Sequence, residues 1–156
     1  ASMYSSYVYA RGNNPLYDTA VDAYVYGYSL VLMDATKKVV TNVPEPNPKG
    51  RAPVNQFSHS EAFPTPEDKD VVSPNADTLY STAWLDLTEE PIILQLPTNL
   101  ERFHLMPILD AWSNVIASPG TRTRTTEENN FAIIGPDWQG TLPDDVIAIK
   151  SPTHIA

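Results

Sequence analysis

The sequence has no cysteine, which excludes disulfide bonds and thiol chemistry for this chain. It also has few basic residues, with 10 Lys and Arg against 19 Asp and Glu and a formal net charge of −9. Nucleic-acid binding depends on clustered Lys and Arg that neutralise phosphate groups, so this charge balance excludes a nucleic-acid partner. The missing cysteines fit a cytosolic and an exported protein equally well and therefore do not decide the compartment.

Long apolar runs and known catalytic motifs are absent as well. No segment reaches the roughly 20 apolar residues that a membrane-spanning helix needs, so no membrane span is expected. The sequence has no glycine-rich phosphate loop, no G-x-S-x-G elbow and no helical histidine pair that would indicate a metal site. His59 lies near Glu61 in sequence, which suggests a metal pair, but two ligands alone predict no site, so no catalytic residue, no cofactor and no metal is expected.

The residues that are present are typical of one ordered domain. The chain has 156 residues, 42% of them hydrophobic, which is enough for a sizeable core. Its 15 prolines are about twice the usual share of roughly 5%. Because proline is poorly tolerated inside helices and central strands, long loops and short strands are expected.

Residues 14–38 predict one long helix. Asn14 suits the position before the helix, Pro15 its first turn, and Asp18 the positive end of the helix dipole. Apolar residues form two adjacent stripes, which predicts burial on more than one side, against a sheet or a partner. Gly27 is expected to pack closely on another backbone, because glycine costs about 1 kcal/mol relative to alanine in a helix. The first stripe contains Leu16, Ala20, Ala23, Gly27 and Val31, and the second contains Tyr17, Val21, Tyr24, Tyr28 and Leu32.

A proline-rich loop over residues 42–76 follows the helix, and the apolar pattern then changes to alternation. Several short strands separated by turn residues are typical of a β-sandwich or barrel. The expected class is α+β, with one long N-terminal apolar helix, the long loop and then an antiparallel β-sandwich. The expected strands are 79–87, 92–96, 102–109, 113–117, 131–135 and 146–150.

The expected domain organisation is an N-terminal arm, residues 1–13, and a single domain over residues 14–156. Residues 7–10 of the arm alternate weakly like a strand. The arm is interpreted either as a loosely ordered terminal segment or as a segment that pairs with a neighbouring subunit. The last residues finish a strand without a closing element, which predicts a domain that is truncated or completed by another chain or segment.

The stretch "SPNADTLY", residues 73–80, is the first candidate site. Pro74 stiffens the approach, and Asn75 and Asp77 can each bond the backbone two residues further on. This pattern predicts a rigid, self-bonded entry into the following strand. The alternative is a polar cluster in which Asn75 and Asp77 orient a small-molecule or sugar ligand and Tyr80 stacks on it.

Two further pairs complete the candidate ligand-binding residues. Asp110 and Trp112 are expected on the same side of a strand, where an acid beside an indole can recognise a sugar. The alternative is a core tryptophan beside an aspartate that caps a turn. Arg122 and Arg124 are expected to share a strand face, where they can hold a carboxylate or phosphate, unless they pair with the abundant surface acids.

Six sequence blocks, taken together and in order, carry a family resemblance. The chain resembles, over about residues 16 to 153, the bacterial family known as domain of unknown function 1254. Two positions depart from the pattern: Ser73 stands where the family often has arginine, and "TEENN" (126–130) replaces a glycine-rich turn. The blocks are "AYVYGYSLVLMD" (23–34), "VNQFSHSEAFP" (54–64), "PNADTLYSTAWLDL" (74–87), "RFHLMPILDAWSNVIASPGTRT" (102–123), "FAIIGPDWQGTLP" (131–143) and "IKSPT" (149–153).

The resemblance implies a jelly-roll-like β-sandwich with flanking helices in a bacterial protein that is exported to the periplasm, the cell surface or the medium. It also implies that a second domain of unknown function often follows. No reaction is established for the family, so the resemblance transfers no catalytic residue. The Ser73 departure weakens the interpretation of this loop as an anion site.

The sequence favours a non-enzymatic, exported β-sandwich module that acts in self-assembly or as a structural subunit. The acidic charge, the apolar helix, the aromatic arm and the unfinished sheet motivate this hypothesis, because an open sheet edge must be covered. Its expected partner is another copy of the chain or the missing C-terminal portion of the family protein. A small-molecule or carbohydrate-binding domain is the first alternative. A hydrolase of unknown substrate is the second, and it would need two titratable groups that converge in a cleft.

Overall fold

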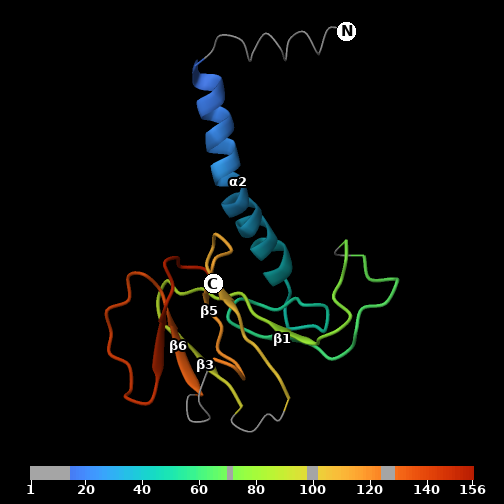
Figure 1. The fold of residues 1–156 in the computed structure, drawn as a ribbon, viewed down its shortest axis with the longest axis vertical. Coiled ribbons are helices and arrows are strands. Elements are labelled where there is room, and N and C mark those ends of the chain that lie inside the picture. Colours follow the sequence, from blue (N-terminus) through green and yellow to red (C-terminus); the bar gives the residue numbers. More distant parts are fainter. Residues whose placement is uncertain (1–14, 70–71, 98–101, 124–128) are drawn as a thin grey trace. The chain divides into compact units, whose positions relative to one another are not determined.

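The computed structural model describes residues 15–69, 72–97, 102–123 and 129–156 (Figure 1). Over these residues the chain is α+β, with helix α2, Pro15–Thr41, followed by short strands. The predicted arm over residues 1–13 lies outside the described residues. The chain divides into two compact units, Ala1–Thr36 and Lys37–Ala156, and the described strands all belong to the second, which is called the β-rich unit below.

Helix α2 confirms the helix predicted over residues 14–38 and extends it to Thr41. It begins at Pro15, whose fixed φ suits the first turn of a helix. Asp18 in the first turn and Lys38 in the last turn complement the helix dipole. Among the helices of the described ranges, none is both long and apolar enough to cross a membrane.

The apolar side chains of helix α2 are exposed. Tyr24 and Val31 are 68% and 69% exposed, and Leu16, Val25 and Tyr26 are similarly open to solvent. A β-carbon added at Gly27 would meet no atom of the described residues within 4 Å, so they do not provide the close backbone packing expected at this glycine. The described residues therefore do not provide the burial that the apolar stripes predict.

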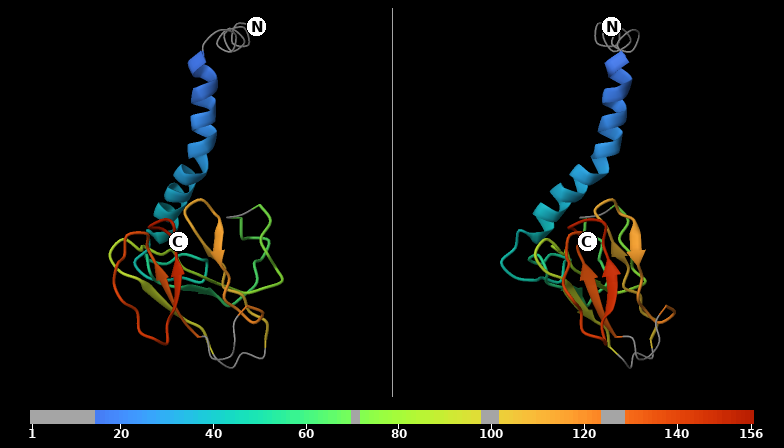
Figure 2. Two further views of the ribbon diagram at one scale, coloured as in Figure 1. Left: turned by 60° about the vertical axis from the view of Figure 1, so that its left-hand side comes forward. Right: turned by 90° about the vertical axis from the view of Figure 1, so that its left-hand side faces the viewer.

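The β-rich unit contains, over its described residues, seven short strands in three sheets (Figure 2). Strands β1 and β2 form one antiparallel pair, and β4 and β5 form another, which is called the β4–β5 hairpin below. The third sheet has the order β3-β6-β7. The strands are β1, Ser58–Ser60; β2, Tyr80–Thr82; β3, Ile92–Gln95; β4, Ile108–Leu109; β5, Val115–Ala117; β6, Asn130–Ile134; and β7, Ile147–Lys150.

Two features of the strands differ from the prediction. Strand β1 lies inside the loop predicted over residues 42–76, where the hydroxyls of Ser58 and Ser60 donate to the carbonyl oxygens of Asn47 and Pro48 at 2.5 and 2.9 Å. Strands β6 and β7 run parallel, although an antiparallel sheet was expected. The segment 135–146 between them supplies about the dozen residues that a parallel crossover needs.

The strand predicted over residues 79–87 is interrupted after Thr82. Beyond the break, Leu85 and Leu87 pair with the last residues of the chain. The Leu85 amide donates to the Ala156 carbonyl oxygen at 2.7 Å, and the Leu87 amide donates to the His154 carbonyl oxygen at 2.8 Å. The alternation that predicted one strand therefore reflects two separate pairings of the same segment.

The core of the β-rich unit is an apolar cluster to which separate sheets contribute. Gly135 follows β6 at a point where a β-carbon would collide with the Leu87 carbonyl oxygen, so this close approach requires glycine. The buried cluster consists of Leu85, Leu87, Leu94, Leu96, Ile108, Phe131 and Ile133.

Candidate functional site

The loop before β2 is held by the side chain of Asn75. Its Oδ1 atom accepts hydrogen bonds from the backbone amides of Asp77 at 2.7 Å and Thr78 at 3.3 Å. Its Nδ2 atom donates to the Thr78 hydroxyl at 3.0 Å and to the Tyr80 hydroxyl at 2.6 Å. The predicted self-bonded entry into the strand is therefore confirmed for Asn75. The side chains of Asn75, Asp77 and Tyr80 are all exposed.

Strands β1 and β2 bring together a histidine and a serine that are 22 residues apart in sequence. His59 and Ser81 are opposite each other in the antiparallel register, and His59 Nδ1 lies 2.8 Å from Ser81 Oγ. The ring of Phe57 stacks on the imidazole, with centroids 5.8 Å apart. Over the described residues no carboxylate hydrogen-bonds to His59, whereas an activated serine needs a base that a third group orients.

Asp110 closes the turn of the β4–β5 hairpin rather than lying on a strand beside Trp112. One carboxylate oxygen accepts from the backbone amides of Trp112 and Asn114, both at 2.9 Å, and the other accepts from Asn114 Nδ2 at 3.0 Å. Ser113 takes up the left-handed conformation in this turn, with φ of 65°. The alternative in which the aspartate caps a turn is the one that the geometry supports.

The pKa of Asp110 reflects two opposing effects. Burial of the carboxyl group, which is 5% exposed, disfavours its ionised form and would raise the pKa. The hydrogen bonds from the Asn114 side chain and from the backbone amides of Asn114 and Trp112 act in the opposite direction. The net result is a pKa below the ordinary value of an aspartate, so Asp110 is a charged structural group at neutral pH.

Arg122 lies beyond β5, at the end of the hairpin opposite the Asp110 turn. Its guanidinium carbon lies 5.1 Å from the centroid of the Phe103 ring, a cation–π contact. In the same region the Thr121 hydroxyl lies 2.9 Å from His104 Nδ1. Arg124, the second arginine of the predicted pair, lies outside the described residues.

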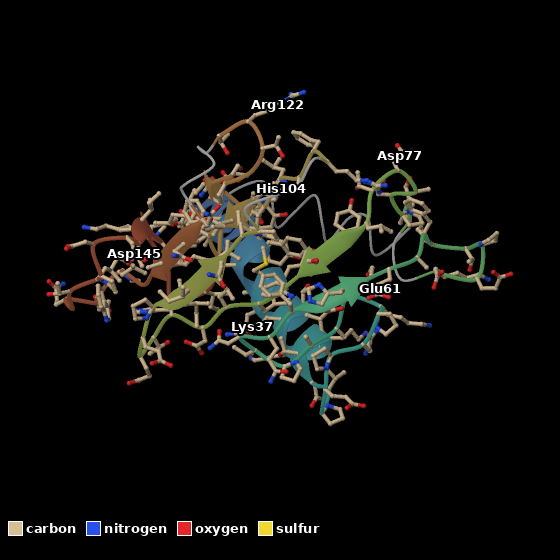
Figure 3. The ribbon with its side chains drawn as sticks, turned by 90° about the horizontal axis from the view of Figure 1, so that it is seen from below. Lys37, Glu61, Asp77, His104, Arg122 and Asp145 are labelled. Atoms are coloured by element: carbon tan, nitrogen blue, oxygen red, sulfur yellow. The ribbon has the colours of Figure 1, made fainter. Side chains whose placement is uncertain are left out.

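The candidate residues thus belong to three parts of the β-rich unit. Asn75 and Tyr80 are brought into direct contact, whereas Asp110 and Trp112 lie in the hairpin turn. Figure 3 shows Asp77 and Arg122 on separate loops. Sequence reasoning missed the cross-strand contact between His59 and Ser81, because the register of two strands separated by a long loop has no local signal.

The remaining charged contacts lie near the end of the chain. Hydrogen bonds from the Thr88 hydroxyl and amide lower the pKa of Asp86, and Lys37, 3.9 Å away, and His154 contribute less. His154 Nε2 lies 3.1 Å from a carboxylate oxygen of Asp137. No group of three His, Asp or Glu side chains in the described part of the chain is placed to hold a metal ion.

Comparison with known proteins relates the chain to a family without an assigned activity. No curated protein matches it. It is similar in structure to the VPA0106 protein from Vibrio parahaemolyticus, with a TM-score of 0.66 and 26% sequence identity. That match covers 88% of this chain and 31% of the Vibrio chain, so this chain spans about a third of the length of its relative. The family described as "Protein of unknown function (DUF1254)" matches residues 54–156, and the chain therefore belongs to the DUF1254 family.

Proposed function

We propose that this chain is a non-enzymatic module that self-assembles, and that helix α2 is the element that contacts a second copy. The observation that carries the proposal is an uncharged, exposed stretch of the helix. Residues 23–33, "AYVYGYSLVLM", contain no charged side chain over three turns. Its large exposed side chains are Tyr24, Val25, Tyr26, Tyr28, Leu30, Val31 and Leu32.

The size of the hydrophobic effect explains why such a helix needs a partner. Burying one large aliphatic side chain contributes about 1.5–3 kcal/mol relative to leaving it exposed. Several such side chains together offset the roughly 4–15 kcal/mol of translational and rotational freedom that association costs. A contiguous exposed apolar surface of this kind is typical of an interaction site.

The polar candidate residues favour assembly over ligand binding or catalysis. Asn75 directs both ends of its amide group to its own loop, and the Tyr80 hydroxyl accepts one of those bonds. Asp110 directs both carboxylate oxygens to its own turn. Side chains that are already bonded within their loops have less capacity left for a substrate, so we give the ligand-binding and hydrolase alternatives second place.

The proposal includes the finer architecture and the location expected from the resemblance. A jelly-roll-like sandwich is supported by Leu94 of β3 and Ile108 of β4, which meet in one core although they belong to different sheets. A crystal structure in which the sheets do not face each other across that core would contradict it. Export is tested by fractionation of the source cells, and recovery only from the cytoplasm would contradict it.

Sedimentation velocity over a range of chain concentrations tests the proposed assembly. The wild-type chain should sediment as a multimer of the 17.3 kDa chain. Leu30→Asp and Val31→Asp should shift the distribution to the monomer, because each buries a charge in the proposed contact. Val72→Asp is the matched control, since Val72 is an exposed valine of the β-rich unit, and it should leave assembly unchanged.

Circular dichroism must show that the helix variants retain their helix. Val31→Thr provides a further variant, in which the shape is kept and only the polarity changes. A wild-type chain that stays monomeric at every concentration would overturn the proposal.

A further inference from the structure

The outer face of the β4–β5 hairpin is a second exposed apolar surface. Burial alternates along residues 103–110: Phe103, Leu105, Pro107 and Leu109 are exposed, whereas the four residues that alternate with them are partly or fully buried. Val115 lies opposite Leu109 in the antiparallel register and extends the same face. Phe103 is 60% exposed and Val115 is 59% exposed. These four residues, Phe103, Leu105, Leu109 and Val115, are called the hairpin face below.

The hairpin face is distinct from the core side of the same hairpin. Ile108 belongs to the buried cluster, and Met106, Ile116 and Ala117 pack against it. A β-carbon at Gly120, opposite Leu105, would lie 2.5 Å from the His104 carbonyl oxygen, so glycine keeps the strands close together here. In the right-hand view of Figure 2 the orange β5 strand lies at one side of the β-rich unit.

We propose that helix α2 from a second copy of the chain docks on the hairpin face. This inference rests on the proposed self-assembly and names the surface that receives the helix. The two surfaces match in length: the uncharged stretch 23–33 spans about 16 Å at 1.5 Å per residue. The hairpin face spans about 20 Å from Phe103 to Leu109 at roughly 3.3 Å per residue.

The helix has a side that suits contact with a sheet. Ala23, Gly27 and Leu30 recur at spacings of four and three residues and therefore lie on one face of the helix. The two small residues let the backbone approach a flat surface, and no atom of the described residues lies within 4 Å of a β-carbon built at Gly27. The hairpin face of a second copy supplies the close backbone neighbour that the described residues do not.

The distribution of charge predicts the orientation of the helix axis on the hairpin face. The hairpin face is basic at the Phe103 end, where Arg102 is exposed and Arg122 covers the Phe103 ring. Asp18 and Asp22 precede the uncharged stretch, whereas Asp34, Lys37 and Lys38 follow it, so the beginning of the helix is acidic and its end carries a net positive charge. In a chain with a net charge of −9, contact between this acidic end and the basic end offsets part of the repulsion between copies. The beginning of the helix should therefore lie at the Phe103 end.

Cysteine cross-linking tests the contact between helix α2 and the hairpin face without background disulfides, because the chain has no cysteine. Ala23→Cys and Leu30→Cys are introduced in one batch of chain, and Leu105→Cys and Val115→Cys in another, each as a single variant. Mixed batches can form helix-to-hairpin disulfides only between copies. We expect Ala23→Cys to cross-link to Leu105→Cys, and Leu30→Cys to cross-link to Val115→Cys. The exchanged combinations should give at most about a tenth of the product. Ser29→Cys, on the opposite face of the helix, is the control and should not react with either position.

A substitution on the hairpin face tests the contact independently, through its effect on the strength of assembly. Val115→Asp should weaken assembly by about tenfold or more, since it places a charge in the proposed contact, where Leu30 is expected to lie. Ile93→Asp is the control, because Ile93 is an exposed apolar residue of β3 on another sheet, and it should leave assembly unchanged.

The outcomes separate this inference from the proposed function. If the wild-type chain stays monomeric, both are overturned. The chain could assemble without forming helix-to-hairpin cross-links between copies, or could form them only within a doubly substituted chain. Either result would contradict docking on the hairpin face and leave the proposed self-assembly in place. If Ala23→Cys cross-links mainly to Val115→Cys, and Leu30→Cys mainly to Leu105→Cys, the helix docks on the hairpin face in the reverse orientation.

Discussion

The β-rich unit and helix α2 contain the same kinds of apolar side chain but place them in opposite environments. Leu87 in the core of the β-rich unit is 2% exposed, whereas Leu32 in the helix is 51% exposed. The β-rich unit supplies its own cover from separate sheets. Within the described residues, large side chains of the helix such as Tyr24 and Val31 are exposed. The two regions therefore differ in how much of their apolar surface the described residues bury, and this difference motivates the proposed assembly.

Leucine-to-alanine substitutions in the two regions should give the largest difference in the free energy of unfolding. Leu87→Ala leaves a cavity in the core and should lower the free energy of unfolding by about 2–5 kcal/mol. Leu32→Ala removes exposed atoms only and should change it by about 0.5 kcal/mol or less in dilute solution. Urea denaturation of both variants measures the difference. Equal losses would show that the helix is already buried within one copy.

Glycine-to-alanine substitutions should act in opposite directions. Gly135→Ala forces a β-carbon against the Leu87 carbonyl oxygen and should destabilise the β-rich unit by about 1–3 kcal/mol. Gly27→Ala meets no neighbour and should stabilise the dilute helix by about 0.5–1 kcal/mol. Thermal unfolding followed at helix and aromatic wavelengths checks both signs. The comparison becomes sharper if Gly27→Ala also weakens assembly, because the added methyl group then meets the second copy.

The Asp110 turn tests whether the β-rich unit depends only on its own contacts. Asp110→Ala leaves the amides of Trp112 and Asn114 without their acceptor and should cost about 1–3 kcal/mol. The pKa of Asp110 is lower in the folded chain than the ordinary value. Its stabilising effect is therefore fully present above about pH 4 and is lost as the pH falls through the folded-state pKa.

The pH dependence of unfolding distinguishes the charge of Asp110 from its shape. Asp110→Asn keeps the shape and should flatten the loss of stability in acid relative to wild type. The loss should be unchanged in Glu61→Gln, because Glu61 is an exposed carboxyl group outside the Asp110 turn. A wild-type acid profile in Asp110→Asn would show that the Asp110 charge does not stabilise the turn.

The loop before β2 should give the smallest effect. Asn75→Ala removes all four hydrogen bonds of this side chain, but the site is exposed, so we expect a loss of about 0.5–1.5 kcal/mol. Tyr80→Phe removes only the bond to the tyrosine hydroxyl and should lose less. If Tyr80→Phe costs as much as Asn75→Ala, the single Asn75–Tyr80 bond, rather than the turn, holds the loop.

The parts of the fold that follow local rules were predictable from the sequence. Helix α2 was predicted because Pro15 and Asp18 give its start and the apolar stripes give its length. The strand near residues 92–96 was predicted from alternation, and the strand near residues 146–150 from the turn residues that separate it from its neighbours. The Asn75 turn was predicted because an Asn side chain can bond the backbone two residues further on.

The parts that were missed depend on contacts between distant residues. Strand β1 has the sequence Ser-His-Ser, which has no apolar alternation, and its serines bond to a neighbouring loop. The parallel direction of β7 depends on the path of the crossover rather than on the strand's own residues. Asp110 was expected on a strand, but the left-handed Ser113 and the self-bonded carboxylate make the segment a turn.

Hydrogen–deuterium exchange at different chain concentrations tests most directly whether the helix is covered only in the assembly. In the β-rich unit, the amides of β3 and β6 should be protected equally at every concentration, because their cover comes from the same chain. The amides of residues 23–33 should exchange rapidly in dilute solution and become protected as the concentration rises through the assembly range. Protection of residues 23–33 that does not change with concentration would contradict the account.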